Sequence, residues 1–164
     1  MDLMLKGKVA IVGGASKGLG RACAQVLAEE GAKVAICSRS KENLEKAAQE
    51  IGSATGADVL AFAGDLERHE VIRSLIAATV ERFGRLDILV SNSGGPPLAD
   101  ARDATEEQWA TAVQRSLLFF SRMARASRCR LLRKAAAAAL STYSRARFTS
   151  RFPISRSRVQ PAWA

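Results

Sequence analysis

The sequence predicts an α/β domain built on a doubly wound parallel sheet, and two observations support this fold class. The apolar run Val9–Val12 stops at glycines, as a buried strand of a parallel sheet does where the backbone must bend sharply. Three further runs of strand type, at residues 34–37, 59–63 and 86–90, alternate with segments of helical periodicity. Because such alternation favours parallel pairing with right-handed crossovers, we expect the strand order 3-2-1-4 with helices on both faces.

The first two helices are predicted from apolar spacing and from the glycines that follow it. One helix begins at the last glycines of the turn after the first strand and closes at Gly31. Its apolar positions, spaced i, i+3, i+4, i+7 and i+8, are Leu19, Ala22, Cys23, Val26 and Leu27. The next helix starts at about Lys41 and ends at Gly52. Its apolar positions are Leu44, Ala47, Ala48 and Ile51.

Two later helices follow the same rules. The helix that ends at Gly84 has apolar or small positions at Ile72, Leu75, Ile76, Thr79 and Phe83. A loop is expected at Gly94–Pro97, after which Thr105 and Gln108 have the spacing of a capping box and open the last helix. The predicted apolar face of this last helix is Trp109, Ala112, Val113, Leu117 and Phe120.

The turn Gly13–Gly20 has the chemistry of a pyrophosphate cradle. Glycine has no Cβ to block a phosphate, and a helix that starts here presents its N-terminal amides to the phosphates. The spacing Gly-x3-Gly-x-Gly resembles the short-chain dehydrogenase/reductase family, whose Rossmann-type domain binds a nicotinamide dinucleotide. Gly13 stands where that family usually has threonine, so one hydroxyl hydrogen bond to the neighbouring loop is lost. The candidate cofactor-binding residues of this turn are Gly14, Ser16, Lys17, Gly18, Leu19 and Gly20.

Two further segments carry the resemblance beyond the turn. Asp65-Leu66 follows the third strand, where the family places an aspartate that accepts a hydrogen bond from the adenine amino group. Asn92-Ser93-Gly94-Gly95 follows the fourth strand and resembles the family's Asn-Asn-Ala-Gly, which implies a cofactor-supporting role for Asn92 and Gly94. Taken alone, Asp65 also fits a helix N-cap and Asn92 an ordinary turn.

The end of the second strand predicts which nicotinamide cofactor is preferred. An NAD enzyme needs an acid there for the ribose hydroxyls, whereas NADP brings a 2′-phosphate that a guanidinium can hold with two hydrogen bonds. This chain has Arg39 and no acid until Glu42, and Lys17 adds a second cation near the same phosphate. NADP, as NADPH, is therefore favoured over NAD.

No catalytic residue can be assigned. The resemblance implies a tyrosine as proton donor, a lysine four residues later and a serine about a dozen residues earlier. The single tyrosine of the chain is Tyr143. Four residues after it stands Arg147 in place of the lysine, and none of residues 129–131, about a dozen positions before it, is a serine. Ser116 stands where the family has a helical asparagine of the proton relay. We therefore interpret the presence of Tyr143 as a coincidence and assign it no catalytic role.

Charge is divided unevenly along the chain. All 16 acidic residues lie in 1–107, which carries a net −3, whereas residues 108–164 carry eleven Arg, one Lys and a net +12. From residue 124 no strand or helix pattern is clear apart from 135–140, and Arg, Ala and Ser dominate. We therefore expect two domains: 1–123, a partial nicotinamide-binding domain, and 124–164, a disordered or aberrant tail foreign to the family.

The remaining composition excludes several classes of protein. With 164 residues, no apolar run of the ~20 residues that span a bilayer and no signal-peptide pattern at residues 1–6, we expect a cytoplasmic protein. Three cysteines without metal or redox spacing predict buried or inert thiols and no metal site. His69 is expected on the surface.

Three functions stay open. The first is a short-chain dehydrogenase/reductase acting on a carbonyl or secondary alcohol, with this chain truncated or frame-shifted and catalytically impaired. The second is a cofactor-binding domain whose basic tail binds nucleic acid or another polyanion, a partner we favour less because few aromatics accompany the arginines. The third is a divergent but active reductase. The resemblance also implies a homo-oligomer that uses the helix around residues 109–120.

Overall fold

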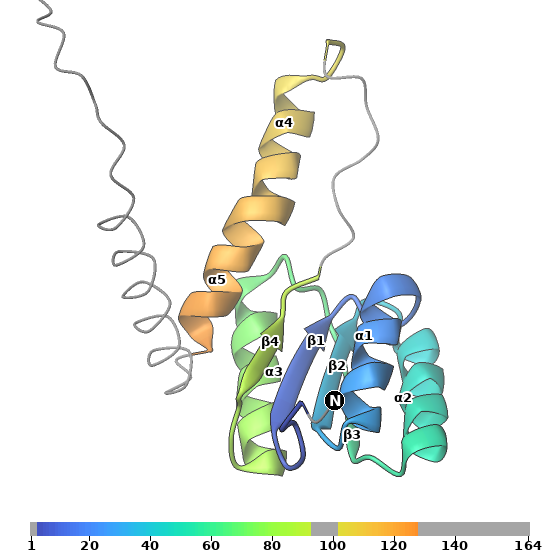
Figure 1. Cartoon of the computed structure of the whole chain (residues 1–164). Coiled ribbons are helices and arrows are strands. Elements are labelled where there is room, and N and C mark those ends of the chain that lie inside the picture. The colour runs from blue at the N-terminus through green and yellow to red at the C-terminus, as the bar shows by residue number, and fades with distance from the viewer. Residues whose placement is uncertain (1–2, 93–101, 128–164) are drawn as a thin grey trace, which may run out of the picture. The chain divides into compact units, whose positions relative to one another are not determined.

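A computed structural model describes residues 3–92 and 102–127 of the chain, and within these ranges strands and helices alternate as expected (Figure 1). The strands are β1 (Val9–Gly13), β2 (Lys33–Ser38), β3 (Val59–Ala63) and β4 (Ile88–Val90). The helices between them are α1 (Gly18–Glu29), α2 (Lys41–Thr55) and α3 (His69–Phe83). After β4 come α4 (Glu106–Val113), a π-helical segment (Gln114–Leu118) and α5 (Phe119–Ala126).

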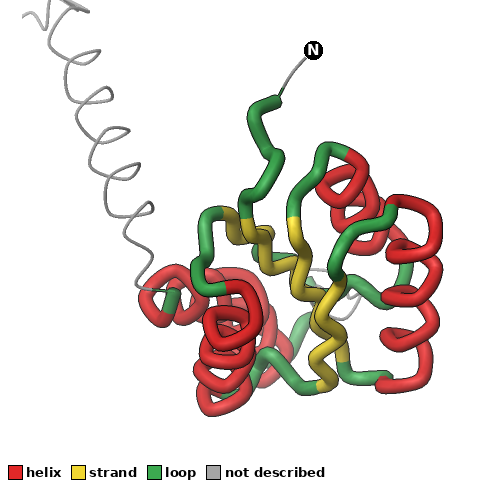
Figure 2. The backbone as a smooth tube through the Cα atoms, turned by 90° about the horizontal axis from the view of Figure 1, so that it is seen from below, coloured by secondary structure: helices red, strands yellow, loops and turns green. Residues whose placement is uncertain are grey.

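The described strands form one parallel sheet in the order β3-β2-β1-β4, which confirms the predicted order. Ile11 of β1 is the register partner of Ala35 in β2 and of Leu89 in β4. Helices lie on both faces of the sheet (Figure 2). The central strands are the most buried part of the described chain, because β1 and β2 have a neighbouring strand on each side and helices above and below.

Helix α1 forms where predicted, but the predicted apolar face is wrong in part. The buried residues of α1 are Gly20, Ala24 and Ala28, whereas Leu19 is 76% exposed and Val26 is 51% exposed. Small side chains let the helix approach the sheet closely, so the face of α1 with the least side-chain volume is the one that packs. Cys23 and Leu27 are half-buried at the margin of this contact.

The predicted end of α2 is also wrong. The helix runs through Gly52 to Thr55, and Gly56, with φ +69°, takes the left-handed conformation that ends it. Its buried residues Leu44, Ala47 and Ile51 confirm the predicted face. Sequence spacing could not distinguish the two glycines, because either can follow a helical turn.

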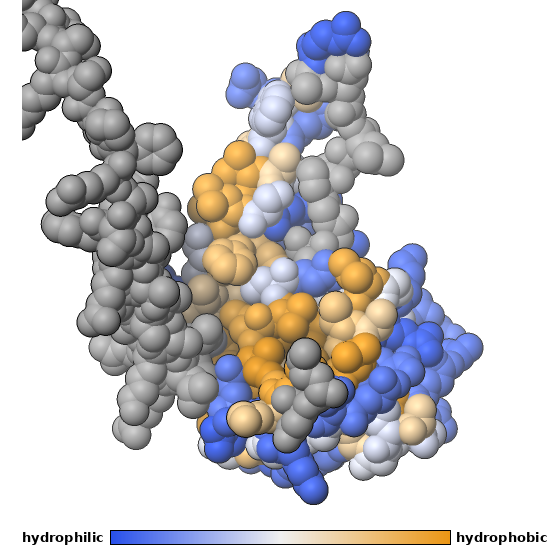
Figure 3. All heavy atoms as spheres, viewed as in Figure 1, coloured by the Kyte–Doolittle hydropathy of each residue, from blue (hydrophilic) through white to orange (hydrophobic). Residues whose placement is uncertain are grey.

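The last predicted helix starts as expected and then exposes its apolar face. Thr105 and Gln108 form the predicted capping box: Gln108 N donates to Thr105 Oγ1 (3.3 Å) and Thr105 N donates to Gln108 Oε1 (2.9 Å). Phe119 and Met123 are buried in α5. Four large side chains of the predicted apolar face are exposed, namely Trp109, Val113, Leu117 and Phe120, and the neighbouring Leu118 is exposed as well. Apolar residues also gather on the side of the molecule that faces the viewer in Figure 3, over the half-buried strand β4.

Candidate cofactor-binding site

A cavity of about 320 Å³ lies where the carboxyl ends of the strands meet the glycine turn. This is the edge at which ligands bind in open α/β sheets, and the volume is within the range of small-molecule sites. The lining residues that the sequence predicted are Gly14, Ser16, Lys17, Arg39, Asp65, Leu66 and Asn92. Of the other predicted site residues, Gly18, Leu19 and Gly20 form the start of α1, and Gly94 lies outside the described residues.

Asn92 fixes the glycine turn against the end of β4. Its Nδ2 donates to the carbonyl oxygens of Gly13 (3.3 Å) and Gly14 (3.4 Å). A Cβ added at Gly20 would overlap the Gly14 carbonyl oxygen and lie 2.8 Å from Asn92 Nδ2. Gly20 is therefore needed for internal packing, whereas Gly18, with φ +60° and no atom within 4 Å of an added Cβ, is needed for its backbone conformation.

The glycine that replaces the family's threonine has its own packing reason. A Cβ at Gly13 would lie 2.6 Å from the backbone oxygen of Asn92 and 3.0 Å from Leu66 Cδ1. The segment after β4 and the segment after β3 thus occupy the space that a threonine side chain would need.

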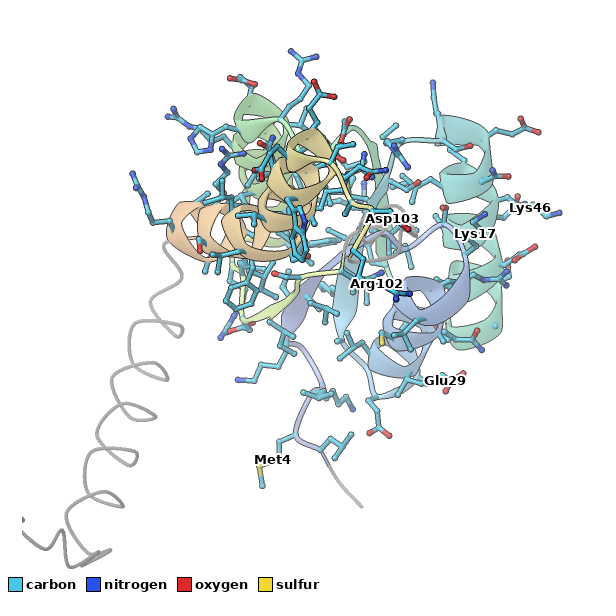
Figure 4. All side chains as sticks on the ribbon, turned by 90° about the horizontal axis from the view of Figure 1, so that it is seen from above. Met4, Lys17, Glu29, Lys46, Arg102 and Asp103 are labelled. Carbon is cyan, nitrogen blue, oxygen red and sulfur yellow. The ribbon has the colours of Figure 1, made fainter. Side chains whose placement is uncertain are left out.

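The loop after β2 contributes polar groups to the cavity and no acid. Ser38 Oγ donates to Ser40 O (3.3 Å), and Ser40 Oγ accepts from Asn43 N (3.4 Å) as the N-cap of α2. Arg39 is exposed and makes no hydrogen bond or ion pair with any residue that the structure describes. Lys17, the residue directly before α1 (labelled in Figure 4), supplies a second cation that lines the same cavity.

The loop after β3 places Asp65 at the cavity by a turn, not by capping a helix. Asp65 Oδ1 accepts from Glu67 N (3.0 Å), and the N-cap position of α3 is held by Arg68 without a side-chain cap. The simple N-cap interpretation of Asp65 is therefore wrong. Glu67, the next acid along, also lines the cavity.

Sequence reasoning missed several residues of this cavity. Glu67 Oε1 lies 2.7 Å from Nε of Arg115 in the π-helical segment, and both residues line the cavity. No sequence signal placed Arg115 there, because its position depends on the loop after β4. Ser91, directly before Asn92, has a buried hydroxyl without a hydrogen-bond partner among the described residues.

Cys37, at the end of β2, is near the cavity but chemically inert. Burial, with a smaller contribution from the Asp65 carboxylate, raises the pKa of Cys37 to about 12. The thiol therefore stays protonated and donates weakly to Gly64 O at 3.7 Å. This confirms that it serves as a small buried side chain.

A larger cavity, of about 1240 Å³, lies between α3 and α5 and contains none of the predicted cofactor-binding residues. Its charged or titratable lining residues are His69, Arg73, Arg122 and Arg125. His69 is exposed at the start of α3, as predicted. Among the helices in residues 3–92 and 102–127, none has the length and apolarity to cross a membrane.

Comparisons with known proteins agree with this geometry. The family described as short chain dehydrogenase matches residues 8–152. An uncharacterized oxidoreductase of Methylorubrum extorquens is 42% identical over 105 residues, which is 64% of this chain and 42% of that protein. The 1,6-dihydroxycyclohexa-2,4-diene-1-carboxylate dehydrogenase of Pseudomonas putida is 38% identical over 119 residues, 73% of this chain and 43% of that protein.

A solved structure extends the likeness to the backbone. L-Sorbose reductase of Gluconobacter frateurii, complexed with NADPH and L-sorbose, matches with a TM-score of 0.72 at 32% identity. The match covers 77% of this chain and 48% of the reductase. The chain thus spans about half the length of the relatives it matches.

Proposed function

The chain belongs to the short-chain dehydrogenase/reductase family, and on that premise we propose that it binds NADPH in preference to NADH. One observation carries the proposal: seven residues chosen from the sequence for cofactor chemistry line one cavity at the carboxyl edge of the sheet. Among them are the two cations, Lys17 and Arg39, while the loop after β2 that also lines the cavity brings no acid to it.

Each part of the cavity has a role in this proposal. The backbone amides at the start of α1 and the glycines before it hold the pyrophosphate. Asp65 accepts from the adenine amino group, and Arg39 with Lys17 holds the 2′-phosphate. When bound, the nicotinamide supplies or receives the hydride in the interconversion of a carbonyl and a secondary alcohol.

We propose further that this chain binds cofactor but turns over carbonyl substrates negligibly. The general acid and the lysine that lowers its pKa are each worth about two or more orders of magnitude in rate. Tyr143 and Arg147, the nearest sequence match to that pair, lie outside the described residues. NADPH oxidation by the purified chain with a panel of ketones and aldehydes measures this, and turnover that disappears in Tyr143→Phe would contradict it.

The cofactor preference is tested by titrating NADPH and NADH against the chain and its Arg39→Asp variant. We expect NADPH affinity to fall about ten- to a hundredfold, because a charge-assisted pair worth about 1.5–3 kcal/mol is replaced by a repulsion, while NADH affinity changes little. Lys46→Asp, which makes the same charge change at an exposed position of α2 outside the cavity, is the control. Equal affinity of the unmodified chain for both cofactors would contradict the preference.

A further inference from the structure

The ion pair between Glu67 and Arg115 joins two segments that lie far apart in the sequence. Glu67 belongs to the loop between β3 and α3, and Arg115 belongs to the π-helical segment between α4 and α5. Both side chains are partly buried, at 34% and 28% exposure, and both line the cofactor cavity. The pair therefore forms one wall of that cavity.

The position of this wall follows from the hydrogen bonds of the loop after β3. Glu67 N donates to Asp65 Oδ1 at 3.0 Å, so the two carboxylates are held on one short turn. Arg115 Nε, 2.7 Å from Glu67 Oε1, therefore lies beside the same turn. In the proposed function Asp65 faces the adenine amino group, which puts the Arg115 guanidinium at the adenine end of the cavity.

The chemistry of the pair suits a flat, uncharged ligand surface better than a phosphate. A guanidinium is planar, is weakly hydrated and stacks on aromatic faces. Because the Glu67 carboxylate lies beside it and neutralises it, Arg115 offers that plane with little net charge. Lys17 and Arg39, which have no carboxylate partner among the described ion pairs, are better placed to hold phosphate.

The helix changes its geometry at this residue. Residues 114–118 are π-helical between two α-helical segments, and Arg115 is the member of this segment that lines the cofactor cavity. Such segments occur often at functional sites, because they rotate a side chain away from the direction that an α-helix would give it.

We propose that Arg115 is an adenine-contacting residue, held against the base by Glu67. This inference rests on the proposed function, since it requires a nicotinamide dinucleotide in the cavity. Its consequence is specific: adenine is common to both cofactors, so Arg115 acts on NADPH and NADH alike, whereas Arg39 acts on NADPH alone.

Fluorescence titration of NADPH and NADH against the full chain and its variants tests the proposal. We expect Arg115→Ala to weaken both nucleotides by the same factor, about three- to tenfold, the range of a cation stacked on a ring. Arg115→Lys should lose as much, because it keeps the charge and the ion pair but lacks the plane. Glu67→Gln should lose about two- to threefold, because the guanidinium is no longer held.

The control variant is Arg122→Ala. It removes an arginine two helical turns after Arg115 that lines the cavity between α3 and α5, and it should leave the affinities for NADPH and NADH unchanged. If Arg115→Ala does not fold by circular dichroism, Arg115→Lys decides the question. Unchanged affinities, or a loss for NADPH alone, would overturn the role of Arg115 while leaving the proposed function intact. An unmodified chain that binds neither nucleotide would overturn both.

Discussion

Residues 3–92, which hold the sheet and helices α1 to α3, and residues 102–127, which are helical, both have apolar side chains at regular spacing. Only in the first region are most of these apolar side chains buried. Ile11 and Ile36 in the central strands are fully buried, whereas Trp109 is 49% and Leu117 is 60% exposed. The strand residues have neighbours on both sides and on both faces of the sheet. Periodicity thus identifies an element, but burial depends on how many elements surround it.

The two regions also differ in how tightly the backbone packs. At the glycine turn, added Cβ atoms at Gly13, Gly14 and Gly20 would all lie within 3 Å of Asn92 or of the turn itself. From α4 through the π-helical segment to α5, the buried residues are Phe119 and Met123 alone, and Arg115 adds an ion pair with Glu67. We therefore expect substitutions at the turn to have the largest effects.

Gly20→Ala should produce the largest loss of stability. Its Cβ would overlap the Gly14 carbonyl oxygen, a backbone atom that cannot move without shifting the turn. We expect a loss of about 2–3 kcal/mol in the free energy of unfolding, measured by urea denaturation, together with loss of NADPH binding.

Gly52→Ala is the matched control in the same region. It lies inside α2, and its added Cβ would meet only Ala57 O at 3.6 Å. Since alanine is the better helix former, a gain of about 0.5–1 kcal/mol is expected. If both variants were equally stable, the close-packing account of the glycine turn would be wrong.

Asp87→Asn should have an intermediate effect that depends on pH. The side chain of Asp87 is 2% exposed; its Oδ2 accepts from Val9 N (3.0 Å), and Arg85 donates to its Oδ1. Burial alone would raise the pKa of Asp87, but the hydrogen bonds from Arg85 and Val9 and the charges of Arg85 and Lys8 outweigh it, and the pKa is lowered. The ionised carboxylate therefore stabilises the junction of β1 and β4.

The sign of the pH effect follows from that lowered pKa. The stabilisation is present above the ordinary value of 3.8 and is lost as the pH falls through the lower pKa of the folded state. We expect Asp87→Asn to cost about 1–2 kcal/mol near neutral pH and progressively less in acid, when urea curves are compared across pH. Asp58→Asn, in an exposed pair with Arg82, should cost about 0.5 kcal/mol or less. A constant cost for Asp87→Asn at all pH values would contradict the charge argument.

These contrasts show where sequence reasoning succeeds. The strand order, the starts of α1 and α2, the end of α3 at Gly84 and the capping box at Thr105 were predictable, because each depends on local patterns and on the handedness of crossovers. The cavity residues after β1, β2 and β3 were predictable for a related reason: the carboxyl ends of parallel strands meet at one edge.

The remaining features depend on three-dimensional contacts that the sequence does not display. The packed face of α1 was missed because small residues, not large ones, contact the sheet at Ala24 and Ala28. Arg115 was missed because the path of the chain after β4 decides what it meets. The predicted boundary at residue 123 stays a prediction, since the family match continues to residue 152 while the structure describes the chain only to residue 127.

The smallest effect on stability, and the most direct test of the exposed helical region, is expected from Leu117→Ser with Phe120→Ser. Together with Trp109 and Val113, these side chains form an apolar stripe along α4, the π-helical segment and α5, all between 46% and 60% exposed. Exposed positions contribute little to folding, so the free energy of unfolding should change by about 0.5 kcal/mol or less.

Association should respond far more strongly than stability to the same double variant. A contiguous exposed stripe of this kind favours a contact with a second copy of the chain, as the family resemblance implies. We expect the unmodified chain to associate with increasing concentration in sedimentation velocity, and the double variant to remain smaller. Val26→Ser, at an exposed position of α1 outside the stripe, should leave association unchanged. An unmodified chain that is monomeric at every concentration would show that the stripe is not a contact between copies. The two regions would then differ in how far their apolar side chains are exposed, and not in whether those side chains bind a second copy.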